Sequence, residues 1–127
     1  MTAISITKVE TDRLIAPVAR FGRVALAVSG GPDSLALLHL SVDFARRHGL
    51  AMPVVLTVDH DLRPGSVAEA ETVARIAEEL ELPHAILTWR HGPVRTGLQA
   101  VAREARYDLM ATYCTAHNIP ALVTAHH

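Results

Sequence analysis

The residues best suited to chemistry form one short polar stretch, numbers 29–34, between two apolar segments. Its adjacent glycines let the backbone approach a ligand closely and adopt dihedral angles that other residues avoid. The amides of such a turn, and the N-terminus of a helix that follows it, favour a phosphate group. Its aspartate suits Mg²⁺, which prefers one or two carboxylates together with phosphate oxygens. The predicted phosphate-binding residues are Ser29, Gly30, Gly31, Pro32, Asp33 and Ser34.

Two common phosphate-binding motifs are absent from this loop. No lysine follows it, as the Walker A pattern G-x-x-x-x-G-K-[ST] requires, and it does not read G-x-G-x-x-G. A simpler interpretation makes the serines turn residues and Asp33 a helix cap, a role that aspartate often fills. We favour the phosphate and Mg²⁺ interpretation, because these polar groups meet at one predicted strand–turn–helix junction.

Alternating apolar segments define the elements that would position this loop. Nearly continuous apolar runs predict buried parallel strands at 23–28, 53–59, 84–89 and 121–125. Amphipathic patterns predict helices at about 33–48, 66–80 and 98–117. Gly49 would end the first helix, a capping box of Ser66 and Glu69 would begin the second, and Asn118 with Pro120 would end the third. This alternation predicts the α/β class, a doubly wound parallel sheet that stops after its fourth strand.

The chain of 127 residues is expected to hold one domain. Residues 1–22 are predicted to be a lead-in with a short helix from about Lys8 to Ala16, and residues 23–127 the N-terminal part of the α/β domain. Because a doubly wound sheet should continue past its fourth strand, we expect this chain to be the front part of a larger protein.

Composition narrows the class of protein. Half of the residues are apolar and the net charge is −1, so no global basic field indicates nucleic acid, and any RNA contact would be a local patch or lie outside this chain. The single cysteine, Cys114, excludes an internal disulfide and is expected to be a buried small apolar residue. No run is long enough to span a membrane and no signal-peptide pattern is present. A cytoplasmic enzyme domain is therefore expected, with a soluble α/β binding domain as its rival.

The expected strand order places the ligand site. In open parallel sheets, ligands bind beyond the carboxyl ends of the strands, where the strand order reverses. With the predicted strands in the order 3-2-1-4, the loop of residues 29–34 would face His126 and His127 across the crevice. Asp59-His60 and Arg90-His91 would follow the neighbouring strands, and a nucleotide contact by His60 is as plausible there as a solvated loop residue.

The long helix at 98–117 carries two candidate cations. Arg103 and Arg106 are three residues apart and so share a face, where ion pairs on a solvated helix surface are the simpler interpretation. The inward stripe is predicted to contain Leu98, Val101, Ala105, Leu109 and Thr112. Trp89, which ends the third predicted strand, is interpreted as core or rim packing in preference to a base-stacking platform.

Several stretches together resemble one branch of a known family. Residues 29–34 resemble the S-G-G-x-D-S PP-loop of the N-type ATP pyrophosphatases. Residues 58–64 resemble V-D-H-G-L-R-P, with Asp61 in place of the glycine, and residues 66–74 resemble the helix that follows it. Residues 98–107 resemble the L-Q-A-x-A-R-E-A-R-Y helix, and residues 124–127 resemble T-A-H-H. In this order and spacing they resemble the N-terminal PP-loop domain of the tRNA(Ile)-lysidine synthases.

This resemblance implies a two-step tRNA modification. ATP would adenylate the C2 oxygen of the wobble cytidine in tRNA(Ile) with a CAU anticodon, releasing pyrophosphate, and the amino group of L-lysine would then displace AMP. Implied partners are ATP, Mg²⁺, L-lysine and this tRNA, without a membrane, and a homodimer is one candidate assembly. The loop would bind the ATP phosphates, Val58 and His60 the adenosine, and His126 with His127 would line the crevice. Asp33, as a Mg²⁺ ligand, and Arg103 and Arg106, on substrate phosphates or lysine, are the implied catalytic residues.

In the family resembled, acidic residues follow T-A-H-H and contribute to Mg²⁺ binding and catalysis, so this chain alone is expected to have little or no synthase activity. Alternatives in the same class are a 2-thiocytidine tRNA synthetase, which needs cysteine pairs, or a GMP or NAD synthetase, which lacks the later motifs. From another class, a non-catalytic nucleotide-binding module of universal-stress-protein type would carry a different phosphate motif.

Overall fold

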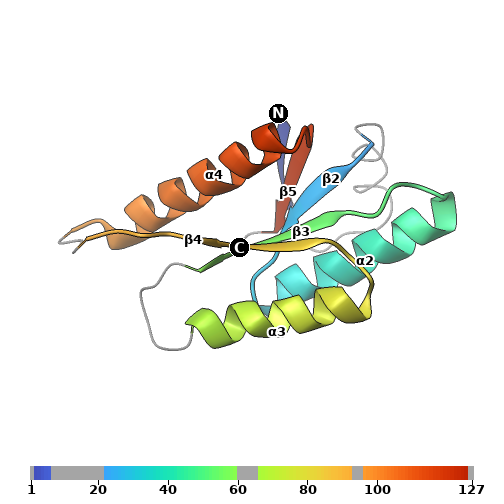
Figure 1. Cartoon of the computed structure of the whole chain (residues 1–127), viewed down its shortest axis with the longest axis horizontal. Helices are drawn as coiled ribbons and strands as arrows, with labels where there is room; N and C mark the ends of the chain where they lie inside the picture. Colours follow the sequence, from blue (N-terminus) through green and yellow to red (C-terminus); the bar gives the residue numbers. More distant parts are fainter. Residues whose placement is uncertain (1, 7–21, 60–65, 93–95, 126–127) are drawn as a thin grey trace.

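The structure, a computed structural model, describes residues 2–6, 22–59, 66–92 and 96–125 and contains one parallel sheet (Figure 1). Its order is β1-β5-β2-β3-β4, and every neighbouring pair is parallel. The strands are β1 (Thr2–Ile6), β2 (Val24–Ala27), β3 (Val54–Asp59), β4 (His84–Thr88) and β5 (Ala121–Ala125). The predicted order of the last four, with reversal beside β2, is therefore confirmed.

The N-terminal strand β1 is a correction to the four-strand prediction. It pairs along its whole length with β5, from Thr2 opposite Ala121 to Ile6 opposite Ala125. A five-residue segment at a chain end carries no turn signals of its own, and its strand conformation depends on the distant partner. The predicted helix from about Lys8 to Ala16 lies outside the described residues.

Within the described residues, three helices cover the two faces of the sheet, which makes a three-layer α/β arrangement (Figure 1). They are α2 (Pro32–His48), α3 (Ser66–Glu79) and α4 (Leu98–Ala116). The first two pack on one face and α4 on the other, so the chain crosses to the opposite face after β4 and returns to β5 beside β2. That crossing creates the reversal of strand order.

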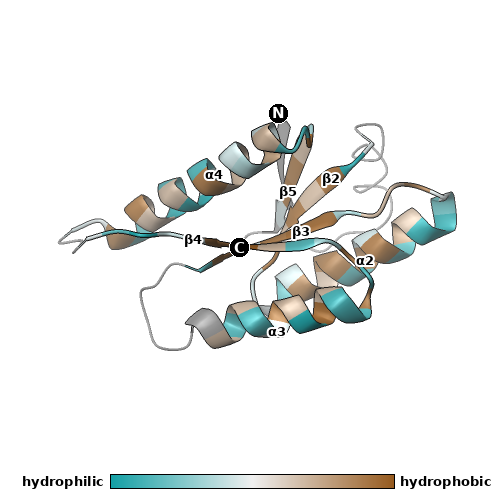
Figure 2. Ribbon diagram, in the orientation of Figure 1, coloured by the Kyte–Doolittle hydropathy of each residue, from teal (hydrophilic) through white to brown (hydrophobic). Residues whose placement is uncertain are grey.

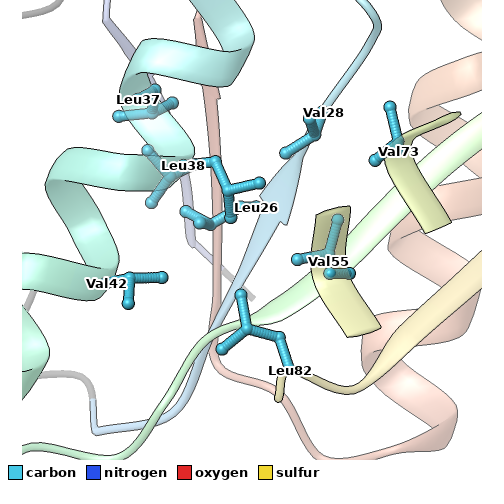
Figure 3. Close-up of a cluster of buried hydrophobic side chains, with 10 residues drawn as sticks. Leu26, Val28, Leu37, Leu38, Val42, Val55, Val73 and Leu82 are labelled. Carbon is cyan, nitrogen blue, oxygen red and sulfur yellow. The ribbon is translucent and has the colours of Figure 1, made fainter. Parts of the chain in front are cut away.

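The face under α2 and α3 holds the larger core. Alternate residues of each strand point to one face: Val55 of β3 packs with Leu26 of β2, Leu38 of α2 and Val73 of α3, as Figure 3 shows. The outer surfaces of α2 and α3 are largely hydrophilic in Figure 2, as expected for helices that cover a sheet.

The face under α4 is packed by a different stripe from the one predicted. The buried residues of α4 are Ala102, Met110 and Cys114, whereas Leu98 and Val101 are each 41% exposed. The stripe runs through every fourth residue, 102, 106, 110 and 114, so Arg106 and not Ala105 lies on it. Cys114 is fully buried, as predicted, and burial raises the pKa of its thiol.

All three helices end at the amino end of the sheet in the same way. One or two residues after each helix, a residue adopts the left-handed conformation: Gly49 with φ 64°, Glu81 with φ 59° and Asn118 with φ 56°. The next amide donates to a carbonyl five residues back: Leu50 to Ala45, Leu82 to Ala77 and Ile119 to Cys114, at 2.8–2.9 Å. These caps satisfy helix-end carbonyls within the chain, and they confirm the predicted stops at Gly49 and Asn118.

Candidate phosphate-binding site

The loop of residues 29–31 lies at the carboxyl end of β2, the strand at which the order reverses. Beyond β2, the Val28 amide donates to the Leu56 carbonyl of β3 at 2.9 Å, which holds the chain in line with the sheet as far as the loop. The helix α2 then begins at Pro32. The predicted strand–turn–helix context of the loop is thus confirmed, at the edge where parallel sheets bind ligands.

Hydrogen bonds inside the loop order the two serines. The Gly31 amide donates to Ser29 Oγ at 3.2 Å, and Ser29 Oγ donates to Ser34 Oγ at 3.2 Å. Since Ser34 Oγ accepts in this pair, it keeps its own proton to donate elsewhere. The two hydroxyls are thereby brought to the start of α2, although they are five residues apart in the sequence.

The loop glycines do not adopt the dihedral angles expected of them. Neither Gly30 nor Gly31 has a positive φ, and Gly31 is extended, at φ −74° and ψ 156°. Pro32 explains this, because a residue before proline is held in the extended or polyproline region. An added Cβ would make only ordinary contacts, 3.8 Å to Glu69 Cβ from Gly30 and 3.4 Å to Ser29 Oγ from Gly31. Neither backbone conformation nor internal packing requires these glycines.

The N-cap residue of α2 does not cap the amides of the first turn with a side chain. This residue is Gly31, which has no side chain to accept a hydrogen bond, and Pro32 occupies the first helical position. The amides of a helix N-terminus carry partial positive charge and favour an anion. Asp33 lies half-buried in this turn, so a carboxylate stands beside the amides that would meet a phosphate.

Glu69, which was predicted only as part of a helix cap, lies beside the loop. It lies in the first turn of α3, and its Cβ and Cγ are 3.8 and 3.9 Å from the position of a Cβ on Gly30. The strand order could have suggested this, since α3 also begins at the carboxyl edge of the sheet. The predicted capping box stays a prediction, because the Ser66 side chain lies outside the description.

Of the other predicted nucleotide contacts, the structure describes only Val58. Val58 packs its side chain into the core under α4, and the next residue, Asp59, is buried at the carboxyl end of β3. His60, His126 and His127 lie outside the described residues, although β5, which leads to the last two, pairs directly with β2 as predicted.

The two candidate arginines of α4 occupy different environments. Arg103 is exposed, whereas Arg106 lies on the stripe that packs against the sheet. Its Nε is buried and, within the described part of the chain, has no hydrogen-bond partner, and its Cζ lies 5.8 Å from the centre of the Tyr107 ring. A buried donor without an acceptor is costly, so Arg106 is the residue that an anionic ligand would satisfy.

The residues present suit Mg²⁺ bound together with a nucleotide. Among the described residues, no three His, Cys, Asp or Glu side chains gather to hold a metal ion by themselves. A single carboxylate, Asp33, at a phosphate-binding turn nevertheless fits Mg²⁺, because phosphate oxygens and waters complete its coordination.

None of the described helices is long and apolar enough to cross a membrane.

Comparison with known proteins gives one consistent family. The model of the PP-loop domain family matches residues 4–127. Relatives named tRNA(Ile)-lysidine synthase include those of Methylobacterium nodulans, 50% identical over 91% of this chain, and Rhodopseudomonas palustris, 44% identical over 96%. The Wolbachia pipientis relative is 44% identical over 83%. The chain spans about a quarter to a third of their length: 33%, 36% and 25% respectively.

A solved structure supports the fold alone. The U34-tRNA thiolase of Methanococcus maripaludis, solved with its [4Fe-4S] cluster, superposes with a TM-score of 0.73. The alignment covers 91% of this chain and 46% of the thiolase, at 14% identity. At that identity the likeness extends to the parallel α/β architecture and to nothing of its chemistry.

Proposed function

Since the chain belongs to the PP-loop domain family, we propose that it binds ATP at the loop of residues 29–34 and forms part of a tRNA(Ile)-lysidine synthase. The structural observation that supports ATP binding most directly is the Ser29–Ser34 hydroxyl pair. It lies at the start of α2, whose N-cap Gly31 has no side chain, beside the reversal of strand order. The identity of 41–51% to several lysidine synthases, over most of this chain, supports the choice of substrate.

The loop's contribution would be to hold the ATP phosphates. The α2 amides and the Ser34 hydroxyl would donate to phosphate oxygens, and glycines at positions 30 and 31 would leave the backbone open to close approach. Asp33 would hold Mg²⁺ against those oxygens, and the ion would offset the charge that develops on the departing pyrophosphate. Because the half-buried Val58 side chain packs against the core under α4, its contact with adenosine would come from its main chain.

The reaction would proceed through an adenylated base. The C2 oxygen of the wobble cytidine attacks the α-phosphorus of ATP, a new P–O bond forms and pyrophosphate leaves. The uncharged amino group of L-lysine then attacks C2, and AMP departs with the original oxygen as the C–N bond forms. Adenylation converts a poor leaving group into a good one, so the task of the protein is to align phosphates and base.

Arg106 would bind a negatively charged group of a substrate, either a phosphate or the lysine carboxylate. Its side chain is half-buried, and its buried Nε lacks an acceptor among the described residues. A phosphate or the lysine carboxylate would supply that acceptor in the planar geometry that arginine recognises. Arg103, exposed one turn earlier, would contribute long-range attraction for the polyanionic tRNA.

ATP–pyrophosphate exchange by the longer synthase of which we propose this chain forms part, measured with and without unmodified tRNA(Ile) carrying a CAU anticodon, tests this function. We expect exchange only when the tRNA is present, because the cytidine is the group that ATP activates. Exchange that proceeds equally well without tRNA would contradict the lysidine proposal and favour a PP-loop enzyme that activates a small molecule. A matched transcript with a UAU anticodon, in which uridine replaces the wobble cytidine, is the control.

A further inference from the structure

A stacked aromatic pair lies at the carboxyl edge of the sheet, outside the proposed ATP site. Trp89 and His91, which follow β4, stack with ring centres 3.9 Å apart and an interplanar angle of 26°. The Trp89 amide donates to the Asp59 carbonyl at 2.8 Å, which anchors the pair to the end of β3. Trp89 is half-buried and His91 is exposed, so the indole supports the imidazole from beneath.

The His91 ring is held by a second contact. Its Nδ1 lies 2.7 Å from the Gly92 carbonyl oxygen, which can only accept, so Nδ1 donates. In the neutral ring this assigns the tautomer and makes Nε2 an acceptor. The imidazole therefore combines a fixed orientation and an exposed position with a hydrogen-bond acceptor on its edge, and exposed Arg90 adds a positive charge beside it.

The helix α4 contains a stacked pair that shows what is unusual here. Tyr113 and His117 are also stacked, at 4.1 Å and 26°, near the amino end of the sheet. Their spacing of four residues makes them neighbours on a helix surface, so helix geometry accounts for that pair. Trp89 and His91 are two residues apart just after β4, a spacing that places side chains of an extended segment on one face, and unlike the helical pair they share an edge with the phosphate-binding loop.

We propose that the His91 ring, supported by Trp89, is a stacking platform for a nucleobase. Aromatic and imidazole rings stack on bases of every type, because each base presents a π face. Since β4 is two strands from β2, the platform lies roughly 10 Å across the sheet from the phosphate loop. The proposal rests on the proposed nucleotide chemistry of this edge and adds a base contact that the phosphate loop cannot provide.

Trp89 is the single tryptophan of the chain, so its fluorescence reports directly on the platform. We would titrate the 127-residue protein with cytidine and adenosine, which have no phosphate, and with ribose 5-phosphate, which has no base. Quenching by the nucleosides but not by the sugar phosphate is expected. Quenching that is absent for both nucleosides, or equal for ribose 5-phosphate, would overturn the proposal.

Variants separate stacking from a purely structural pair. His91→Ala should weaken nucleoside affinity about tenfold, and His91→Phe should restore most of it, since a phenyl ring also stacks. His117→Ala, in the helical pair, is the matched control and should leave affinity unchanged. If His91→Ala lowers the midpoint of urea unfolding but leaves nucleoside affinity intact, the stack is structural and the proposal fails.

Two further arms identify the source of the base and keep the two proposals distinct. The affinities of ATP and of an RNA stem-loop with a CAU anticodon are each measured for the original protein and for His91→Ala. The ligand whose base stacks on the platform should bind the variant about tenfold more weakly. Asp33→Asn should weaken ATP binding and leave cytidine quenching unchanged. Loss of ATP binding with intact nucleoside quenching would thus fault the phosphate loop alone, and the reverse result would fault the platform alone.

Discussion

The helix termini at the two ends of the sheet are capped differently. At the amino end, α2, α3 and α4 each stop at a left-handed residue whose neighbour's amide returns to a carbonyl five residues back. At the carboxyl end, the N-cap residues of α2 and α4 are Gly31 and Gly97, which have no side chain to cap the helix amides. The carbonyls of one end are satisfied by the chain itself, whereas at the other end the N-cap residues of these two helices leave the first amides without a cap of their own.

This difference assigns separate tasks to the two ends. Buried apolar residues such as Leu82 and Ile119 follow the caps of the amino end and join the core, so that end contributes to stability. The carboxyl end instead gathers the ordered serines, Asp33 and the Trp89–His91 stack. Substitutions at the amino end should therefore change the free energy of unfolding, and those at the carboxyl end should change ligand binding.

The largest expected effect is on stability, at the amino end. Leu82→Ala should lower the free energy of unfolding by about 3 kcal/mol, because a large buried side chain that contacts the core under α2 and α3 is lost. Urea unfolding measures this change, and ATP affinity of the folded variant should not change. Leu98→Ala, at a residue 41% exposed, is the control and should stay within about 0.5 kcal/mol. A loss of ATP affinity in Leu82→Ala would break the division between the ends.

Asp33→Asn tests the carboxyl end of the sheet, and Asp43, further along the same helix α2, provides the matched control. Removing the negative charge that would hold Mg²⁺ should slow tRNA-dependent ATP–pyrophosphate exchange about a hundredfold, with little change in stability. Asp43→Asn removes only an exposed pair with Arg47, at 2.9 Å, and exchange should continue at the original rate. Equal losses in the two variants would show that helix charge in general, and not the loop carboxylate, is responsible.

The two arginines of α4 provide a smaller, paired test. Arg106→Lys should weaken turnover about tenfold, because an ammonium cannot reproduce the planar donors, the buried Nε among them, that a guanidinium offers to a phosphate or carboxylate. Arg103→Lys keeps the exposed charge and should have almost no effect. The ratio of the two kcat/KM values is the measurement, and a larger loss for Arg103→Lys would reverse the assignment.

How far the sequence could predict this structure depends on whether a feature is local. Strand–turn–helix alternation and the stops at Gly49 and Asn118 follow from short-range patterns, whereas the order of four strands was assumed from the doubly wound class; the structure confirms all three. The loop was also located correctly, because its apolar flanks indicate a strand and a helix. The roles of its residues in binding ATP and Mg²⁺ stay predictions.

Features that depend on tertiary contacts could not be predicted. The strand β1 forms only because β5 offers an edge, and the stripe of α4 was misplaced because both sets of residues contain apolar side chains at helical spacing. That error also placed Arg106 with Arg103 on a solvated face. The approach of Glu69 to Gly30 required the relative positions of separate segments, and the stacking of His91 on Trp89 required the local path of the chain after β4.

Glu81 offers a way to strengthen the amino end. A residue with a side chain is strained in the left-handed conformation, by roughly 1–2 kcal/mol, and glycine removes that strain. After allowance for the greater freedom of glycine in the unfolded chain, Glu81→Gly should raise the free energy of unfolding by about 0.5–1 kcal/mol. Glu78→Gly, inside α3, should instead lower it by about 1 kcal/mol. Denaturant midpoints of the two variants should therefore move in opposite directions.

The smallest effect concerns pH and again belongs to the amino end, where β4 starts. His84 Nε2 lies 2.9 Å from Thr57 Oγ1 on the neighbouring strand, and partial burial lowers the pKa of this imidazole below its usual 6.5. The unfolded chain therefore binds this proton at a higher pH than the folded protein does, so stability falls as the pH drops below about 6.5. His84→Gln should reduce that dependence in urea unfolding between pH 7.5 and pH 5, roughly the range in which histidine titrates. Thr57→Val should keep it, because burial and not the hydrogen bond is the cause. A pH dependence that His84→Gln leaves unchanged would move the effect to other histidines, and a dependence that Thr57→Val abolishes would make the hydrogen bond, and not desolvation, the origin of the shift.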